Sequence, residues 1–180
     1  MIKVKLNDSK GDQQHMADVL LAIDLQNGVC YGDKPAANMP QALAGINARI
    51  AAYRKAKKPI VFVQHTDEDL VQGTHDWELI SGLDHRDSDP LVTKNHANAF
   101  YHTNLRRVLT SFAAESLEIC GAQTEYCVDT TTKVAHGIGY DLQMTPGLTT
   151  TVDNQFMTAE QTIAFYEGIW NHRFVTMLKA

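Results

Sequence analysis

The stretch that decides the fold is residues 117–140, LEICGAQTEYCVDTTTKVAHGIGY. A short apolar run over 117–120 is followed by glycine, which is typical of a buried strand. Turn residues occupy 121–126, and from Cys127 onward apolar side chains recur at helical spacing until Gly137. The stretch therefore predicts a strand, a tight turn and a helix that opens at or just before Cys127.

Cys127 is a candidate nucleophile because of this placement. A thiol in the first turn of a helix faces unpaired backbone N–H groups and the positive end of the helix dipole. Both favour thiolate over thiol, and the same backbone groups are donors for an oxyanion. A single cysteine in a globular chain is nevertheless more often a small buried hydrophobic residue. The nucleophile interpretation therefore depends on what the rest of the chain supplies.

Strand and helix patterns alternate along the remaining sequence. Apolar runs predict strands at 18–24, 60–63, 91–94, 141–145 and 174–178, with a short element at 149–153. Helical spacing predicts helices at 39–57, 103–114 and 158–172, the last capped by Thr158, and loops at 25–33 and 64–90. This alternation predicts an α/β fold, a single-domain three-layer α/β/α arrangement with a mostly parallel, Rossmann-like central sheet.

Size and composition fit one domain. The chain has 180 residues, 44% of them hydrophobic, and a formal net charge of -5. We assign 17–180 to the domain, and 1–16 to an extension or to residues added ahead of a natural start at Met16. The negative charge argues against a nucleic-acid partner, and no apolar run is long enough to span a membrane. Three cysteines make no disulfide framework, so we expect a cytoplasmic protein.

Three residues with chemically useful side chains lie at the ends of predicted strands. Asp24 closes the first strand, Lys94 closes the third, and Cys127 follows the fourth. Ligands of parallel sheets bind beyond the carboxyl ends of the strands, so the three should gather at one edge. Taken singly, an aspartate at a strand end is usually a cap and a lysine is usually solvated.

Three motifs together resemble the isochorismatase-like cysteine hydrolases, which include nicotinamidases and N-carbamoylsarcosine amidases. They are the D-x-Q-N sequence that begins at Asp24, TKNHANAFYHTNL around Lys94 and GAQTEYCVDTT around Cys127. The resemblance covers the chain from about residue 19 to its end. It implies an Asp–Lys–Cys catalytic triad at Asp24, Lys94 and Cys127, and a homodimer or homotetramer.

The resemblance also implies details around the nucleophile. The backbone N–H groups of Gln123 and Cys127 would hold the oxyanion, and the peptide bond between Ala122 and Gln123 would be cis. In this chemistry Asp24 accepts the thiol proton and later activates a water, while the Lys94 charge keeps the carboxylate ionised. The thiolate would attack a carbonyl and form a thioester.

The segment after the second strand bears on metal binding. Nicotinamidases of this family hold a metal there with an aspartate and several histidines, and His65, Asp67 and His75 are ligand types in this chain. His65 stands about where the family has aspartate, and Asp67 about where it has histidine. The sequence GTHDWEL looks like that of metal-free members. We therefore expect no metal and no cofactor, with His65 lining the pocket or hydrogen-bonding the turn.

Pocket walls are assigned only by their position beside the motifs. Gln26, His65, Trp77, Phe100 and Tyr126 are candidates for a slot that takes a small acyl group. The alternative is that Trp77 and Phe100 simply pack the protein interior.

Two other cysteines compete with Cys127 for the role of nucleophile. Cys120 lies within a predicted strand and is expected in the core, whereas Cys30 lies in a predicted loop and could react but has no partner set.

The sequence leaves three functional hypotheses. The first is a cysteine-dependent hydrolase of a small carboxamide or related C–N bond. The second is an isochorismatase-type hydrolase of an enol ether, which needs acid catalysis by Asp24 more than a thiol. The third is a catalytically idle family member that serves as a binding module.

Overall fold

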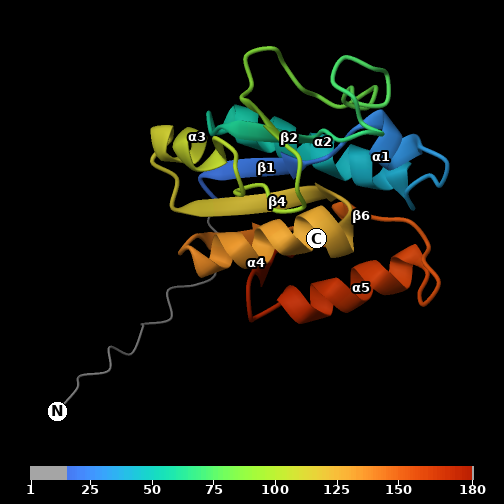
Figure 1. The fold of residues 1–180 in the computed structure, drawn as a ribbon. Coiled ribbons are helices and arrows are strands. Elements are labelled where there is room, and N and C mark those ends of the chain that lie inside the picture. Colours follow the sequence, from blue (N-terminus) through green and yellow to red (C-terminus); the bar gives the residue numbers. More distant parts are fainter. Residues whose placement is uncertain (1–15, 180) are drawn as a thin grey trace.

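The middle layer of the molecule is a seven-stranded parallel sheet (Figure 1). The computed structural model describes residues 16–179, so the predicted N-terminal extension lies outside the described residues apart from Met16. The strand order is β3-β2-β1-β4-β5-β7, with β6 beside β4, and every pairing among the described strands is parallel. The strands are β1 Val19–Ile23, β2 Ile60–His65, β3 Leu91–Lys94, β4 Ser116–Ala122, β5 Asp141–Met144, β6 Thr149–Thr150 and β7 Thr176–Met177.

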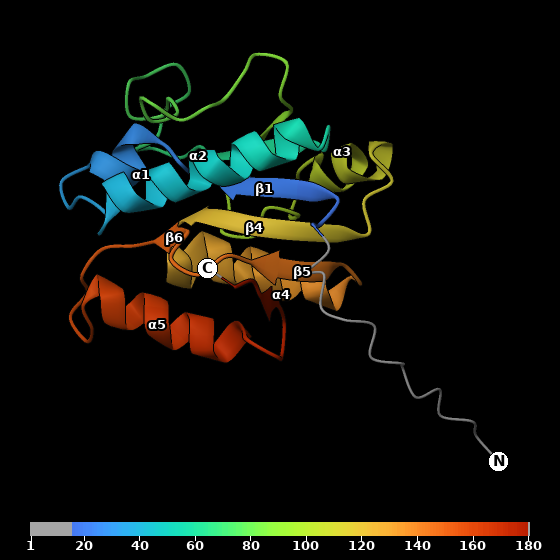
Figure 2. The same ribbon diagram turned by 180° about the vertical axis from the view of Figure 1, so that it is seen from behind.

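Helices cover both faces of this sheet, as Figures 1 and 2 show from opposite sides. One face carries α1 and α2, and the other carries α3, α4 and the C-terminal end of α5. In the part of the chain that is described, no helix has the length and apolarity needed to cross a bilayer. The helices are α1 Asn27–Tyr31, α2 Met39–Lys55, α3 Leu105–Ser111, a π-helical turn η1 Thr124–Val128, α4 Asp129–Gly137 and α5 Ala159–Trp170.

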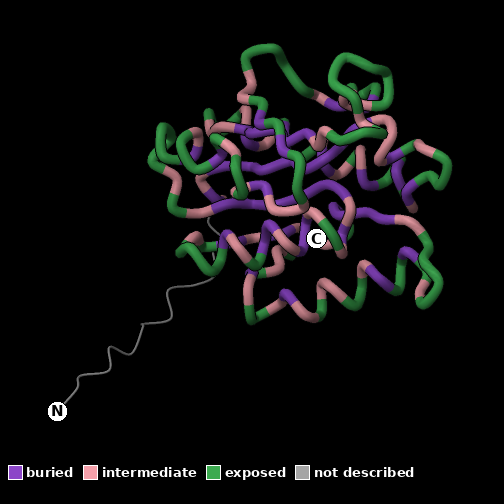
Figure 3. Tube along the Cα trace, viewed as in Figure 1, coloured by how far each residue is buried: buried purple, intermediate pink, exposed green. Residues whose placement is uncertain are grey.

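The central strand β1 is buried on both sides, which explains its unbroken apolar sequence (Figure 3). Side chains alternate along a strand, so Leu21 and Ile23 pack toward α3 and α4 while Leu20 and Ala22 pack toward α2. The α/β fold, the parallel sheet and the covering of both faces predicted from the sequence are therefore confirmed.

Two local predictions differ from the structure. The segment 25–33 was predicted as a loop but contains α1, whose first N–H groups, those of Asn27 and Gly28, donate to the carbonyls of Glu78 and Asp76. The helix predicted to open near Cys127 begins earlier, as the π-helical turn at Thr124, and continues without a break into α4. The helix α1 was not predicted because it is held by hydrogen bonds to a distant segment, which local sequence does not reveal. The early start at Thr124 was not predicted because a π-helical turn departs from α-helical periodicity.

A buried carboxylate holds α2 against the sheet. Glu118 lies in β4 with none of its surface exposed. Its two oxygens accept hydrogen bonds from Arg49 and Tyr53 of α2 and from Thr145 beyond β5. A buried charge needs such partners, because an unpaired carboxylate away from water would be strongly destabilising.

Candidate active site

Lys94 stands at the centre of the candidate site. Its side chain is fully buried, and its ammonium nitrogen Nζ lies 2.6 Å from Asp24 Oδ2 and 3.2 Å from Cys127 Sγ. Aspartate, lysine and cysteine, which are 70 and 33 residues apart along the chain, thus meet at one point. That point is the carboxyl edge of the sheet, where the sequence placed all three.

An unusual backbone angle helps to bring the acid to the lysine. Lys94 shares a face of β3 with Val92, the face that looks toward α3 and α4. Continued alternation along β1 would turn Asp24 to the opposite face, beside Ala22. Asp24 instead has a φ of 49°, in the left-handed region that few residues other than glycine adopt. This bend directs its carboxylate to the side on which Lys94 lies.

The Asp24 carboxylate is buried, and only one of its two oxygens accepts a hydrogen bond among the described residues. Oδ2 accepts from Lys94, whereas Oδ1 is without a hydrogen-bond partner among the described residues. Burial raises the pKa of this carboxyl, and the neighbouring Lys94 ammonium partly offsets that rise. A carboxylate with a free oxygen and a raised pKa is a better proton acceptor for a thiol than an ordinary surface aspartate.

Cys127 lies within the π-helical turn η1 and is half-buried. Burial, followed by the Asp24 carboxylate, raises the pKa of its thiol while the Lys94 ammonium lowers it, and the net result is a pKa of about 12. Burial and the neighbouring carboxylate thus oppose the ionisation that the helix terminus and the Lys94 ammonium favour. One lysine compensates one negative charge, which favours a state in which Asp24 and Cys127 share one proton.

The backbone before Cys127 has the cis peptide bond that the resemblance implied. The peptide bond between Ala122 and Gln123 is cis. Gly121 has a φ of 123°, and a side chain there would collide with the backbone of Ile23 in the neighbouring strand. Gln123 precedes the turn that carries Cys127, so its N–H group stays a candidate oxyanion donor together with that of Cys127.

Gln26 and Trp77 do not occupy the places predicted for them. Gln26 is fully buried; its side-chain amide donates to the carbonyls of His65 and Trp77 and accepts from the His65 N–H. A side chain with no exposed surface cannot touch a substrate, so Gln26 instead ties the end of β2 to the loop that carries Trp77. Trp77 donates its indole N–H to Thr66 Oγ1 at 2.8 Å and lines a cavity with Phe62 and Leu91 that contains no triad residue.

The other two aromatic candidates, Phe100 and Tyr126, differ in their surroundings. Phe100 packs, with Cys127, against the core beneath α3 and α4, and its ring stacks on that of Tyr140 at 5.9 Å between centroids. Tyr126 directly precedes Cys127 and is 57% exposed. Phe100 therefore packs the protein interior, the alternative stated for it above, while Tyr126 stays a candidate for contact with a ligand.

His65, predicted to line the pocket or to hydrogen-bond the turn, contacts the Lys94 side chain directly. Its Nδ1 atom lies 2.9 Å from Lys94 Nζ, and its Nε2 atom lies 3.1 Å from Asp67 Oδ2. The register explains the first contact, because His65 of β2 and Lys94 of β3 are paired residues on adjacent strands. His75, the third residue of ligand type in this segment, has an exposed side chain beside Asp76.

Three potential metal-ligand atoms surround the lysine. Atoms of Asp24, His65 and Cys127 lie within 4.8 Å of one another, the sole such group among residues 16–179. Lys94 Nζ is within hydrogen-bonding distance of each of the three side chains. The ammonium thus occupies the position in which these atoms would otherwise hold a cation.

The remaining cysteines are buried in the core. Cys30 belongs to α1 with no exposed surface, contrary to the prediction that it lies in a loop and could react. Burial raises the pKa of its thiol to about 12. Cys120 is buried in β4, as the sequence predicted. Cys127 is thus the most exposed of the three thiols.

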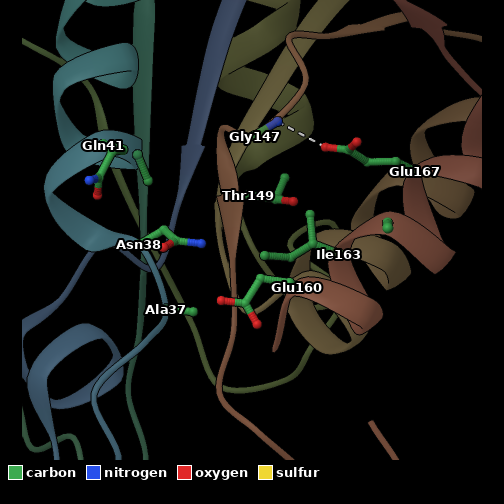
Figure 4. A pocket seen from close by; sticks show the side chains of 10 residues that line it. Ala37, Asn38, Gln41, Gly147, Thr149, Glu160, Ile163 and Glu167 are labelled. Atoms are coloured by element: carbon green, nitrogen blue, oxygen red, sulfur yellow. Dashed lines mark hydrogen bonds between the residues drawn. The ribbon is translucent and has the colours of Figure 1, made fainter. Parts of the chain in front are cut away.

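A separate cavity of about 430 Å³ lies between the start of α2 and α5 (Figure 4). Asn38, Thr149, Glu160, Ile163 and Glu167 are among the residues that line it. Glu167 accepts a hydrogen bond from the N–H of Gly147 at the rim. No triad residue reaches this cavity, so it is distinct from the site around Lys94.

Comparisons with known proteins identify relatives of this chain. A model of the isochorismatase domain matches residues 18–167. A secreted isochorismatase effector of Verticillium dahliae is 29% identical over 128 residues, covering 69% of this chain and 67% of that protein. Nicotinamidase 3 of Arabidopsis thaliana is 24% identical over 172 residues, covering 86% and 84%.

Solved structures extend the likeness to the fold. A crystal structure of an isochorismatase family protein has a TM-score of 0.87 at 46% identity, covering 89% of this chain and 97% of that one. N-carbamoylsarcosine amidase from Thermoplasma acidophilum, at 17% identity, shares the fold with a TM-score of 0.77 over 91% and 96% of the two chains. The chain therefore belongs to the isochorismatase family of hydrolases.

Proposed function

We propose that this protein hydrolyses a small carboxamide or a related C–N bond, with Cys127 as nucleophile and a thioester as intermediate. The observation that carries the proposal is the contact of Lys94 Nζ with both Asp24 and Cys127, which leaves Asp24 Oδ1 free as the proton acceptor. Relatives whose names denote amide chemistry, a nicotinamidase and an N-carbamoylsarcosine amidase, support this class of substrate.

The first half-reaction transfers the acyl group to sulfur. Asp24 Oδ1 takes the thiol proton as Cys127 Sγ bonds to the carbonyl carbon, and the C=O electron pair moves onto oxygen. The N–H groups of Gln123 and Cys127 would stabilise that oxyanion. The C=O bond then re-forms, the C–N bond breaks, and the leaving nitrogen takes the proton held by Asp24.

The second half-reaction releases the acid. Asp24, again ionised, removes a proton from water while the water oxygen attacks the thioester carbon. The C–S bond breaks, and the thiolate recovers the proton from Asp24. Throughout both halves the site holds one negative charge opposite the Lys94 ammonium, first on the carboxylate, then on the oxyanion and, when the thioester breaks, on sulfur, so the net charge of the buried site stays constant.

Ammonia release over a panel of small amides, including nicotinamide and carbamoylated amines, tests the proposal. We expect at least one to be turned over, and Cys127→Ala to lower that rate at least about 1,000-fold. Addition of hydroxylamine should divert the acyl group to a hydroxamate, because a thioester reacts readily with that nucleophile. Full activity in Cys127→Ala would refute a thioester route.

An enol-ether hydrolase is the second candidate, favoured by the raised pKa of Asp24. A carboxyl that stays protonated more readily is suited to donate a proton to a vinyl carbon. In that case Cys127→Ala would retain turnover of an enol ether while Asp24→Ala would not. The same pair of variants therefore separates the two chemistries.

A further inference from the structure

The three hydrogens of the Lys94 ammonium have three acceptors, and one of them lies outside the proposed triad. Nζ is 2.6 Å from Asp24 Oδ2, 3.2 Å from Cys127 Sγ and 2.9 Å from His65 Nδ1. The lysine side chain is fully buried, so solvent does not supply an alternative partner. The direction of each N–H bond is thus set by all three neighbours together.

This contact fixes the state of the His65 ring. An ammonium only donates, so the Nδ1 atom that faces Lys94 must be the unprotonated nitrogen of a neutral imidazole. Nε2 then carries the hydrogen and donates it to Asp67 Oδ2 at 3.1 Å. Burial and the adjacent Lys94 charge lower the pKa of His65, while Asp24 and Asp67 act in the opposite direction. Geometry and electrostatics therefore agree on a neutral ring.

Asp67 is itself held in place. Its other oxygen, Oδ1, accepts hydrogen bonds from the N–H groups of Asp69 at 3.0 Å and Leu70 at 2.8 Å. The Leu70 N–H, followed by that of Asp69, keeps the pKa of Asp67 below its ordinary value. The loop after β2 thus presents a fixed, ionised carboxylate to the outer nitrogen of the ring.

We propose that His65, oriented by Asp67, is a positioning residue that aims the Lys94 ammonium at Asp24 and Cys127. This inference rests on the proposed function, because it assigns His65 a part in the same reaction. Without the third acceptor, Nζ is free to rotate its hydrogens away from the acid and the sulfur. Misplacement of a catalytic group by about 1 Å is enough to slow a reaction about 100-fold.

Two other roles for His65 fit the contacts less well. Both ring nitrogens are engaged, Nδ1 with Lys94 and Nε2 with Asp67, so neither is left to take a proton from a substrate or water. As a metal ligand, His65 would have to release Lys94, which contacts every one of the three potential ligand side chains. Orientation of the lysine uses both nitrogens as they stand.

Three substitutions separate the two hydrogen bonds of the ring. In His65→Asn the side-chain oxygen can stand where Nδ1 stood, so the acceptor for Lys94 is kept and the contact with Asp67 is lost. In His65→Gln the amide reaches the position of Nε2 instead, and in His65→Leu both polar contacts are lost. His75→Asn is the matched control, because His75 is a second histidine beside an aspartate but is exposed and outside the site.

The kinetic expectation is a change in kcat rather than in KM. With the amide that the wild type hydrolyses, His65→Leu and His65→Gln should lower kcat about 10- to 100-fold and leave KM within about threefold. His65→Asn should recover kcat to within about fivefold of wild type, and His75→Asn should equal it. A purely structural histidine would give no recovery in His65→Asn, and that result would overturn the proposal.

Nitrogen NMR of histidine-labelled protein gives a readout that needs no turnover. At pH 6.5 we expect the His65 ring to be neutral, with Nε2 protonated and Nδ1 not, and Asp67→Asn to weaken this preference. A protonated Nδ1 would overturn the inference even if amides are hydrolysed. If no amide is turned over but the ring has the expected state, the proposed reaction fails while the contact with Lys94 stands.

Discussion

At the scale of single residues, Asp24 takes part in more of the proposed proton transfers than any other side chain. Its free oxygen Oδ1 is the proton acceptor in both halves of the proposed reaction. Asp24→Asn keeps the size of the side chain and removes the base, so kcat should fall about 1,000-fold. Steady-state kinetics measure the loss, with Asp141→Asn at an exposed position of β5 as the control. Retention of more than about a tenth of wild-type kcat would exclude this role.

Gly121 makes a second prediction at this scale, for stability. A Cβ atom at this position would collide with the backbone of Ile23, and its φ of 123° disfavours any side chain. Gly121→Ala should therefore lower the free energy of unfolding by about 3 kcal/mol. Gly137→Ala is the control, since a Cβ there meets open space at the end of α4 and should be neutral or stabilise by about 0.5 kcal/mol. Urea unfolding of both variants decides the point.

The sequence predicts which residues form the candidate site better than it predicts how their side chains are placed. Asp24, Lys94 and Cys127 were found from strand-end positions and motifs, and the structure brings their side chains together. The positive φ of Asp24 was not predictable, because aspartate adopts this region only in a minority of cases and the apolar run before it predicts an extended strand. The pairing of His65 with Lys94 was missed as well, since it depends on strand register, which apolar runs do not specify.

At the scale of elements, the attachment of α2 to the sheet depends on one buried charge. Glu118→Gln keeps the shape of the side chain but leaves Arg49 without its counter-charge. We expect the free energy of unfolding to fall by about 3 kcal/mol. Chemical denaturation measures it, and Glu68→Gln in an exposed loop should change it by less than about 0.5 kcal/mol. Equal changes in the free energy of unfolding for the two substitutions would show that the buried pair does not stabilise the fold more than an exposed glutamate does.

The start of α5 is an example of a feature that local sequence predicts correctly. Thr158 was predicted as its cap, and the structure has a full capping box in which Thr158 and Gln161 bond to each other's backbone. The short α1 and the π-helical turn could not be predicted in this way. The first is held by carbonyls about 50 residues away, and the second places its hydrogen bonds outside the α-helical spacing.

At the scale of the whole molecule, several groups that ionise at high pH are buried in the core. Burial raises the pKa of Cys30 from 9.0 to about 12, and it also raises the pKa values of Cys120 and Tyr53. Above pH 9 the unfolded chain releases these protons while the folded chain keeps them. The free energy of unfolding must therefore fall as pH rises, by up to about 1.4 kcal/mol per pH unit for each thiol.

Urea unfolding of reduced protein between pH 8 and pH 11 tests this account. Cys30→Ala should be less stable than wild type at pH 8 because it leaves a cavity, yet its stability should decline less steeply above pH 9. The two curves should therefore converge at high pH. Parallel curves would show that the Cys30 thiol ionises equally in both states.

The overall architecture was predictable because it depends on coarse patterns. Apolar runs that alternate with helical spacing are enough to specify a parallel sheet between two helical layers, and β1 shows why: it is buried on both faces and therefore apolar throughout. The contacts of Gln26 and Trp77 were not predictable, because they join segments whose relative position follows only from the complete fold.

The most direct test of the central claim is rapid-quench mass spectrometry of the intact protein during turnover of its amide. We predict an adduct with the mass of the acyl group on the peptide that contains Cys127, absent in Asp24→Asn and in Lys94→Met. Turnover at the wild-type rate with no adduct on Cys127 at any time point would contradict the claim that these three side chains form one catalytic unit.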